Sequence, residues 1–167
     1  MEQVNEITTF KYLHDRYLEE QLRYTHFENK SSKLLTYITG VIGFLTFYAT
    51  FNKSQLFDFD TYIHISRFII FLFTISLVIC AWGHTLRAIK IGDCPNLPLT
   101  ANVLIYLEKA PKSQRDPYLI DCYMDTMQEL SIHINDKSKN LEYAYEELFY
   151  SACTLCLLGL ITIMMEF

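Results

Sequence analysis

Three long stretches of this sequence contain no aspartate, glutamate, lysine or arginine, and they constrain the fold more than any other feature. They cover residues 34–52, 68–86 and 148–165. A helix needs about 20 residues to cross the ~30 Å hydrocarbon core of a bilayer. Helices buried in a soluble core are an alternative, but three such runs in 167 residues make that alternative a poor one. The sequence therefore predicts an all-α membrane protein with three transmembrane helices.

The basic residues indicate how the three predicted spans cross the membrane. Five lysines and arginines precede the first span, seven lie between the second and the third, two lie in the loop 53–67, and none follows the third. Cytoplasmic loops carry the excess of lysine and arginine. The N-terminus is therefore expected in the cytoplasm, and the loop 53–67 and the C-terminus outside. The first six residues agree, because they lack the positive start and apolar run of a secretory signal.

We expect a single membrane domain over residues 1–167 with four parts. A cytoplasmic helix covers residues 1–33, a transmembrane hairpin 34–86, further cytoplasmic helices 87–147, and the third span 148–167. The first proline in the chain is Pro95. The N-terminal helix can therefore continue into the first span without a break.

Glycine and proline predict where the helices between the second and third spans begin and end. Residues 92–98, Gly-Asp-Cys-Pro-Asn-Leu-Pro, are typical of a turn. Thr100 suits the N-cap of a short helix, and Pro111 falls just past its end. Asp116 followed by Pro117 is typical of an N-cap and a first helical residue. The helix from Pro117 would continue through the third span for about 50 residues, or roughly 75 Å.

Apolar residues alternate at spacings of three and four in both helices that lead into the outer spans, which is coiled-coil periodicity. The two series are Phe10, Leu13, Tyr17, Tyr24, Phe27 and Leu34, and Ile120, Tyr123, Met127, Leu130, Ile134, Leu141, Ala144 and Leu148. One charge interrupts each series, Glu20 in the first and Lys137 in the second. These charges are a candidate pair that fixes register within or between subunits. Alternatively, each reaches water at the end of its apolar stem.

No pattern in the chain is typical of an enzyme, so no catalytic residue and no metal site is predicted. Cys153 and Cys156 have CxxC spacing, but they lie inside a predicted span, unlike redox motifs. Five cysteines in a reducing compartment predict no structural disulfide. The net charge of −5 gives no basic surface for a nucleic acid polymer. His84 is a candidate intramembrane ionisable residue, although it can also reach the lipid headgroups.

Small and weakly polar residues form a stripe along one face of the first span, at helical spacings of three and four. They are Thr36, Thr39, Gly40, Gly43, Thr46 and Thr50. Small residues let helices approach closely in lipid, and threonine can hydrogen-bond across the contact. The stripe is a candidate helix-packing face or, in an oligomer, the lining of a pore. A thinner stripe of Ser151, Cys156, Gly159 and Thr162 follows the third span.

The order of these parts, with Glu28-Asn29-Lys30 before the first span and the asparagine- and lysine-containing segment 130–145 before the last, resembles a known family. The chain resembles the Pycsar transmembrane effectors of bacterial anti-phage defence and is similar to the related two-span SMODS/SLOG-associated effectors. The resemblance implies a bacterial inner-membrane protein that is switched on by a signal, often a cyclic nucleotide made by a partner enzyme. It assigns no binding residue, because no position here matches a nucleotide-binding motif.

Two functions follow as hypotheses. The first is a defence effector that oligomerises in the inner membrane and disrupts it when activated. The alternative is a small membrane anchor or assembly subunit that binds a cytoplasmic partner through its helical seam. Both imply a homo-oligomer in the lipid membrane, since three spans alone enclose no channel. A membrane enzyme is disfavoured, because the spans lack paired carboxylates or histidines. No cofactor is expected, and a cyclic nucleotide is the ligand that the resemblance implies.

Overall fold

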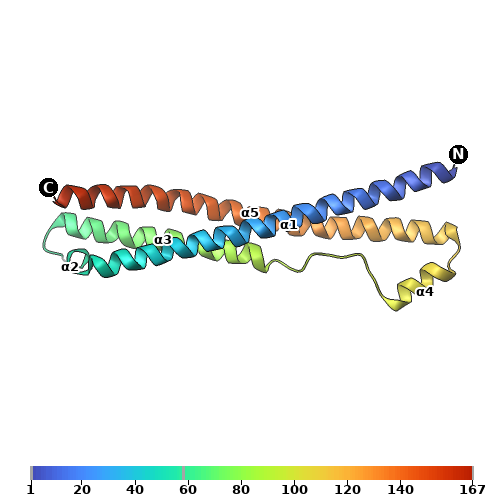
Figure 1. Cartoon of the computed structure of the whole chain (residues 1–167), viewed down its shortest axis with the longest axis horizontal. Helices are drawn as coiled ribbons and strands as arrows, with labels where there is room; N and C mark the ends of the chain where they lie inside the picture. Colours follow the sequence, from blue (N-terminus) through green and yellow to red (C-terminus); the bar gives the residue numbers. More distant parts are fainter. Residues whose placement is uncertain (1, 58, 167) are drawn as a thin grey trace. The chain divides into compact units, whose positions relative to one another are not determined.

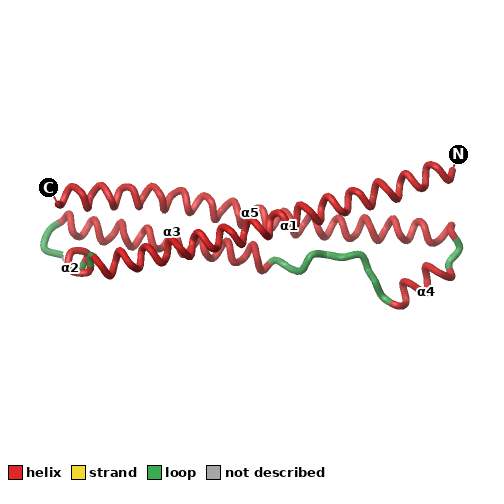
Figure 2. The backbone as a smooth tube through the Cα atoms, viewed as in Figure 1, coloured by secondary structure: helices red, strands yellow, loops and turns green. Residues whose placement is uncertain are grey.

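The computed structural model describes residues 2–57 and 59–166, and every regular element in these ranges is a helix. The helices are α1 (Glu2–Phe51), α2 (Lys53–Leu56), α3 (Tyr62–Lys90), α4 (Ala101–Lys109) and α5 (Lys112–Glu166) (Figure 1). The longest connection, residues 91–100, joins α3 to α4 (Figure 2). The all-α fold predicted from the sequence is confirmed.

Two helices account for most of the chain, and each runs without a break into an apolar segment. α1 has 50 residues and α5 has 55. A continuous helix keeps its backbone hydrogen bonds internal, which is what a segment entering lipid requires. The prediction that both helices continue into the first and third apolar runs is confirmed.

The short helix α4 is bounded as the sequence predicts. Thr100 is its N-cap, and the Thr100 Oγ1 accepts a hydrogen bond from the backbone N–H of Val103 at 3.3 Å. The helix ends at Lys109, before Pro111. The cap satisfies one of the backbone donors that every helix start leaves without a partner.

The predicted start of α5 at Pro117 is wrong, because the helix begins five residues earlier, at Lys112. The carbonyl of Pro111 accepts the backbone N–H groups of Gln114 and Arg115 at 3.0 and 3.1 Å, so a helical turn forms ahead of Pro117. A proline inside a helix removes one backbone hydrogen bond, a loss that a helix of this length tolerates near its start. Asp116 is thus a helical residue and not an N-cap.

The connection between the first two apolar segments is also shorter than predicted. Sequence analysis placed Arg67 in the loop 53–67, whereas α3 begins at Tyr62 and includes Arg67, whose side chain is fully buried. A single charged residue ends an apolar run in a sequence scan, but it does not end a helix, because arginine is a good helix former.

Three helices are long and apolar enough to cross a membrane, in agreement with the three predicted spans. Only 17%, 22% and 11% of the residues in their most apolar windows are buried. Helices in a soluble core would bury most of these side chains, since burial of apolar surface is what drives such a core to form. The structure therefore fits a multi-pass membrane protein, in which lipid covers what the chain leaves exposed.

The chain divides into two compact units, each built from two separate segments. Unit 1 consists of Met1–Glu28 and Ile91–Asp136, and unit 2 of Asn29–Lys90 and Lys137–Phe167. Unit 1 holds the charged parts of α1 and α5 together with α4, and unit 2 holds the three apolar segments. Each long helix thus contributes one part to each unit.

The core of unit 1 lies where the predicted heptad seams of α1 and α5 meet. Tyr17 and Tyr24 of α1 form a buried cluster with Leu130 and Ile134 of α5. Tyr17 also packs edge-on against Tyr123, with the ring centroids 5.9 Å apart. The partly buried residues around the cluster are Phe27, Cys94, Leu97, Tyr123 and Met127, so the connection 91–100 covers one side of this core.

Small side chains line the packing face of α3 in unit 2. Its buried positions recur at helical spacing and include threonines and alanines, which let neighbouring helices approach closely. The described buried residues of unit 2 are Leu34, Ile38, Leu45, Leu56, Phe71, Val78, Ala81, Ala88, Leu141, Ala144 and Leu158, with the polar and charged residues Ser31, Arg67, Thr74, Thr85, Lys137 and Ser151. All three apolar segments therefore contribute one narrow stripe to a common core.

Leu130 tests the unit 1 core. Its side chain is fully buried, whereas that of Ile132 on the same helix is 52% exposed. We expect Leu130→Ala to cost about 2–5 kcal/mol of stability, because it removes buried methyl groups and leaves a cavity. Ile132→Ala is the matched control and should cost far less. Thermal unfolding followed by circular dichroism measures both, and equal losses would contradict this placement of the core.

Candidate functional site

The stripe predicted on the first span lies on the surface of unit 2. All six of its residues, Thr36, Thr39, Gly40, Gly43, Thr46 and Thr50, are exposed. Each threonine hydroxyl donates a hydrogen bond to the carbonyl four residues earlier in α1, at 2.8–3.1 Å. These bonds satisfy the hydroxyl protons within the helix and leave the oxygen lone pairs as acceptors.

The two glycines make this face flat. A Cβ atom added at Gly40 or Gly43 would meet nothing within 4 Å. The stripe is therefore not a packing face within the described part of the chain. If it packs, it does so against another molecule.

An apolar groove borders the stripe between α1 and α3. It has a volume of about 230 Å³. Its walls are Ile42, Leu45, Thr46 and Ala49 of α1 and Phe71, Ile75, Val78 and Ile79 of α3. Thr46 belongs to both the stripe and the groove, so the two features form one continuous surface.

Two hydroxyl pairs connect the apolar helices of unit 2. Thr74 of α3 donates to Thr154 of α5 at 2.9 Å, and the Tyr48 hydroxyl of α1 lies 3.0 Å from that of Thr162 on α5. Sequence analysis placed Thr162 in a thin polar stripe but missed the other three residues as contacts. The sequence signal that could have indicated these contacts is a hydroxyl-bearing residue within a charge-free apolar run, as at Thr74, Thr154 and Tyr48. Such bonds typically contribute about 0.6 kcal/mol each in lipid.

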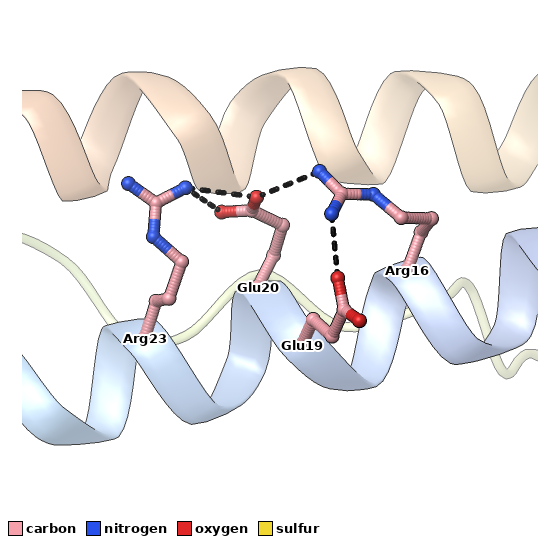
Figure 3. Close-up of polar contacts among 4 residues, drawn as sticks. All are labelled: Arg16, Glu19, Glu20 and Arg23. Atoms are coloured by element: carbon pink, nitrogen blue, oxygen red, sulfur yellow. Dashed lines mark hydrogen bonds and ion pairs between the residues drawn. The ribbon is translucent and has the colours of Figure 1, made fainter.

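Glu20, one of the two predicted seam charges, is paired on its own helix in unit 1. Its carboxylate lies 2.9 Å from the guanidinium of Arg23 and 3.4 Å from that of Arg16, and Arg16 also contacts Glu19 at 2.5 Å. Figure 3 shows these four side chains along one side of α1. Spacings of three and four residues place these groups on one helix face. Lys137 is fully buried in unit 2. A pairing of Glu20 with Lys137 stays a prediction.

The hydroxyl group of Tyr24 holds the start of the connection 91–100 against the core of unit 1. Its hydroxyl donates to the carbonyl of Gly92 at 2.5 Å and lies 3.3 Å from that of Ile91. Gly92 has a φ of 39°, a left-handed conformation that favours glycine. A Cβ atom there would also lie 2.7 Å from the ring of His133. Residues 92–98, predicted as a turn, form an irregular connection without a regular turn, and glycine at position 92 allows its left-handed conformation.

Burial raises the pKa of Tyr24 to about 12, and the nearby carboxylate of Glu28 adds to the increase. The folded chain therefore holds the phenol proton more tightly than the unfolded chain, in which the pKa is about 10. The corresponding stability is fully present below pH 10 and is lost as the pH rises toward 12.

Tyr24→Phe tests this linkage. We expect the melting temperature of the wild type to fall between pH 9 and 11.5 more steeply than that of Tyr24→Phe, which has no phenol to ionise. Tyr12→Phe is the control, because Tyr12 is 63% exposed. Tyr17, whose pKa burial also raises, is present in all three proteins. Parallel pH curves for the wild type and Tyr24→Phe would contradict the assignment.

His84 lies on α3 with its ring against that of Tyr143 on α5, the centroids 5.4 Å apart. Its Nδ1 is buried and has no hydrogen-bond partner among the described residues. The Oε2 atom of Glu147 on α5 is also buried without a hydrogen-bond partner among the described residues. Glu147 was not predicted as a site residue, because a charged residue that directly precedes an apolar run is expected to be exposed to water.

The cysteines form no disulfide in the structure, and Cys153 and Cys156 of the CxxC sequence are both exposed. Within residues 2–57 and 59–166, no three histidine, cysteine or acidic side chains gather closely enough to hold a metal ion.

A cleft of about 510 Å³ lies in unit 1. It is lined by Thr9, Phe10, Lys112, Ser113, Asp116, Pro117 and Ile120.

No protein-family model, characterised protein or solved structure matches this chain. The candidate site is therefore defined by its own geometry, as an exposed, flat, weakly polar stripe on an apolar helix.

Proposed function

We propose that this protein is a bacterial anti-phage effector that oligomerises in the inner membrane and disrupts it when a signal activates it. The observation that carries the proposal is the exposed stripe on α1. Lipid chains gain little from contact with threonine and glycine, whereas a second helix gains close backbone packing and hydrogen bonds there. The stripe therefore favours a second copy of the chain as its neighbour.

The layout of the apolar helices supports a disruptive role. Few of the residues in their most apolar windows are buried within one chain, and three spans enclose no channel by themselves. In a closed ring of subunits, the stripe of each copy would face either a neighbour or a central pore. The threonine oxygens, which retain free lone pairs, would provide such a pore with a weakly polar lining.

The alternative function, an anchor that binds a partner through its heptad seam, is less well supported. The seam residues Tyr17, Tyr24, Leu130 and Ile134 bury one another within unit 1. A seam that is filled by the chain's own helices offers no apolar groove to a partner helix.

Unit 1 has a place where a signal of the proposed kind could bind. Its cleft of about 510 Å³ falls within the size range of small-molecule sites. Lys112, Ser113 and Thr9 supply a charge and hydroxyls that can bind a phosphate, and Phe10 and Ile120 supply apolar walls. The carboxylate of Asp116 also lines the cleft, and Arg115 lies 3.5 Å from it. A cyclic nucleotide from a partner enzyme is the ligand that we propose.

The proposed orientation places the N-terminus in the cytoplasm and the C-terminus outside. Alkaline phosphatase fused to the C-terminus should therefore be active in intact cells, because this enzyme folds only outside the cytoplasm, and the same fusion at the N-terminus should be inactive. An active N-terminal and an inactive C-terminal fusion would contradict the proposed orientation, and two fusions that are both active or both inactive in a membrane-inserted protein would contradict three crossings.

Leucine at Gly40 and Gly43 tests the role of the stripe. Both positions have open space within one chain, so the double variant should fold but should hold a second helix apart. Overpacking costs about 1–3 kcal/mol, so self-association in detergent should weaken roughly 5- to 150-fold. Activated cells should then keep their membrane potential, which a voltage-sensitive dye reports.

Gly83→Leu is the matched control, because Gly83 of α3 has equally open space but lies off the stripe. It should associate and depolarise cells as the wild type does. A Gly40→Leu/Gly43→Leu protein that still depolarises cells would exclude the stripe as the assembly face. An intact membrane potential with the activated wild type would exclude the proposed function itself.

A further inference from the structure

The connection between α1 and α3 carries large apolar side chains that the chain itself does not cover. Phe57, Phe59 and Tyr62 are 50%, 52% and 91% exposed. Connections that lie in water are usually polar, and apolar patches exposed on a protein surface mark contacts with a membrane or with another protein. This segment therefore needs a partner that covers aromatic rings.

The aromatic rings of this connection are held in place by α3. The ring centroid of Phe68 on α3 lies 5.7 Å from that of Phe57 and 5.3 Å from that of Phe59, and the second pair meets edge-to-face. The short helix α2 also packs against α3, and its last residue, Leu56, is fully buried. The connection is thus folded back onto the start of α3 and presents its aromatic side chains from a fixed position.

The first two turns of α3 are apolar around most of the surface that they expose. Their exposed apolar residues are Tyr62, Ile63, Ile65 and Ile69. At about 100° per residue, these side chains spread over an arc of about 160° around the helix. A helix that packs against one neighbour needs an apolar stripe of only about 100°. One neighbouring helix would therefore leave part of this arc uncovered, whereas lipid would cover all of it.

The polar groups of this region are arranged as contact with lipid requires. Ser66, which lies within the exposed arc, donates its hydroxyl proton to the carbonyl of Ile63 at 2.8 Å. Arg67 lies outside the arc and is fully buried. Lys53 and Asp60, on either side of the two phenylalanines, are exposed and can reach headgroups or water. Charges that border aromatic rings are typical of the membrane interface and not of the hydrocarbon centre.

We propose that Phe57, Phe59 and the first turn of α3 form a membrane-interface segment, which inserts among the headgroups and upper acyl chains of a phospholipid bilayer. The segment joins two helices that are long and apolar enough to cross a membrane, so it lies at a membrane surface in either orientation of the chain. Aromatic rings are favoured at this depth, and binding there grows with the apolar area that is covered. This inference stands apart from the proposed effector function, since an anchor protein would use the same contact.

Fluorescence quenching of a single tryptophan tests the proposal with the full-length chain in phosphatidylcholine nanodiscs, which leave both membrane faces accessible. The probe is Tyr62→Trp in a Trp82→Phe background, because Trp82 is the chain's own tryptophan. Tyr12→Trp in the same background is the matched control, since Tyr12 is also exposed but lies among the charged residues of α1 in unit 1. Phe73→Trp, at an exposed position within the apolar part of α3, is the reference for the hydrocarbon core.

We expect a doxyl group near the headgroup end of the acyl chain to quench most of the Tyr62→Trp fluorescence, and iodide in the water to quench it far less than Tyr12→Trp. A doxyl group near the methyl end of the acyl chain should quench Phe73→Trp most strongly. Quenching of Tyr62→Trp by iodide to the extent seen for Tyr12→Trp would overturn the proposal, because the connection would then lie in water. Protection of Tyr62→Trp from all three quenchers would also overturn it, because protein would then cover this surface.

A second probe shows whether the result depends on the substitution at position 62. Phe59→Trp in the Trp82→Phe background keeps an aromatic ring at the position that contacts Phe68. We expect the same order of quenching, with the doxyl group near the headgroups most effective. A Phe59→Trp protein that iodide quenches and neither doxyl lipid does would contradict the proposal, because the connection would then project into water.

Discussion

Exposed apolar surface on continuous helices is the constraint on which the rest of this structure depends. α1, α3 and α5 keep their backbone hydrogen bonds internal, yet they bury only a narrow stripe of side chains against one another. In water, so much uncovered apolar area would be strongly unfavourable. In lipid it costs nothing, and the driving force for helix contact becomes close packing and hydrogen bonding instead. This explains why alanine and threonine, rather than leucine alone, line the buried face of α3.

Unit 1 follows the rules of a water-soluble helix pair. Its core consists of tyrosines and large aliphatic residues, and the buried carboxylate of Glu20 beside it pairs with the half-exposed Arg16 and Arg23. These arginines satisfy a carboxylate that would be costly to bury alone, while the core and the Tyr24 hydrogen bond to Gly92 hold the unit together. The same hydrogen bond holds the first residues of the connection 91–100 against Tyr24 within unit 1.

The helical parts were predictable because their signals are local. Charge-free runs of 18 or 19 residues, the N-cap Thr100 and the absence of proline before Pro95 each act within a few turns of one helix. The start of α5 was mispredicted because Pro117 is a local signal that the preceding turn overrides. Glu147 could not be recognised, since its burial depends on the register of α3 against α5, and no periodicity within one helix contains that information. The stripe on α1 was found, but sequence alone could not tell that it faces away from the chain.

The ionisable side chains of unit 2 lie at the ends of its apolar segments. Arg67 lies near the start of the apolar segment of α3, His84 lies near its end, and Glu147 directly precedes that of α5. Between these ends, the hydroxyl pairs Thr74–Thr154 and Tyr48–Thr162 join helices. Bonds of this kind contribute about 0.6 kcal/mol each in lipid, so close packing of small and apolar side chains has to supply most of the stability of the contacts between these helices. Charged groups are costly to bury in a medium of low dielectric constant, which is the physical reason why the middle of each apolar segment contains hydroxyl groups rather than charges.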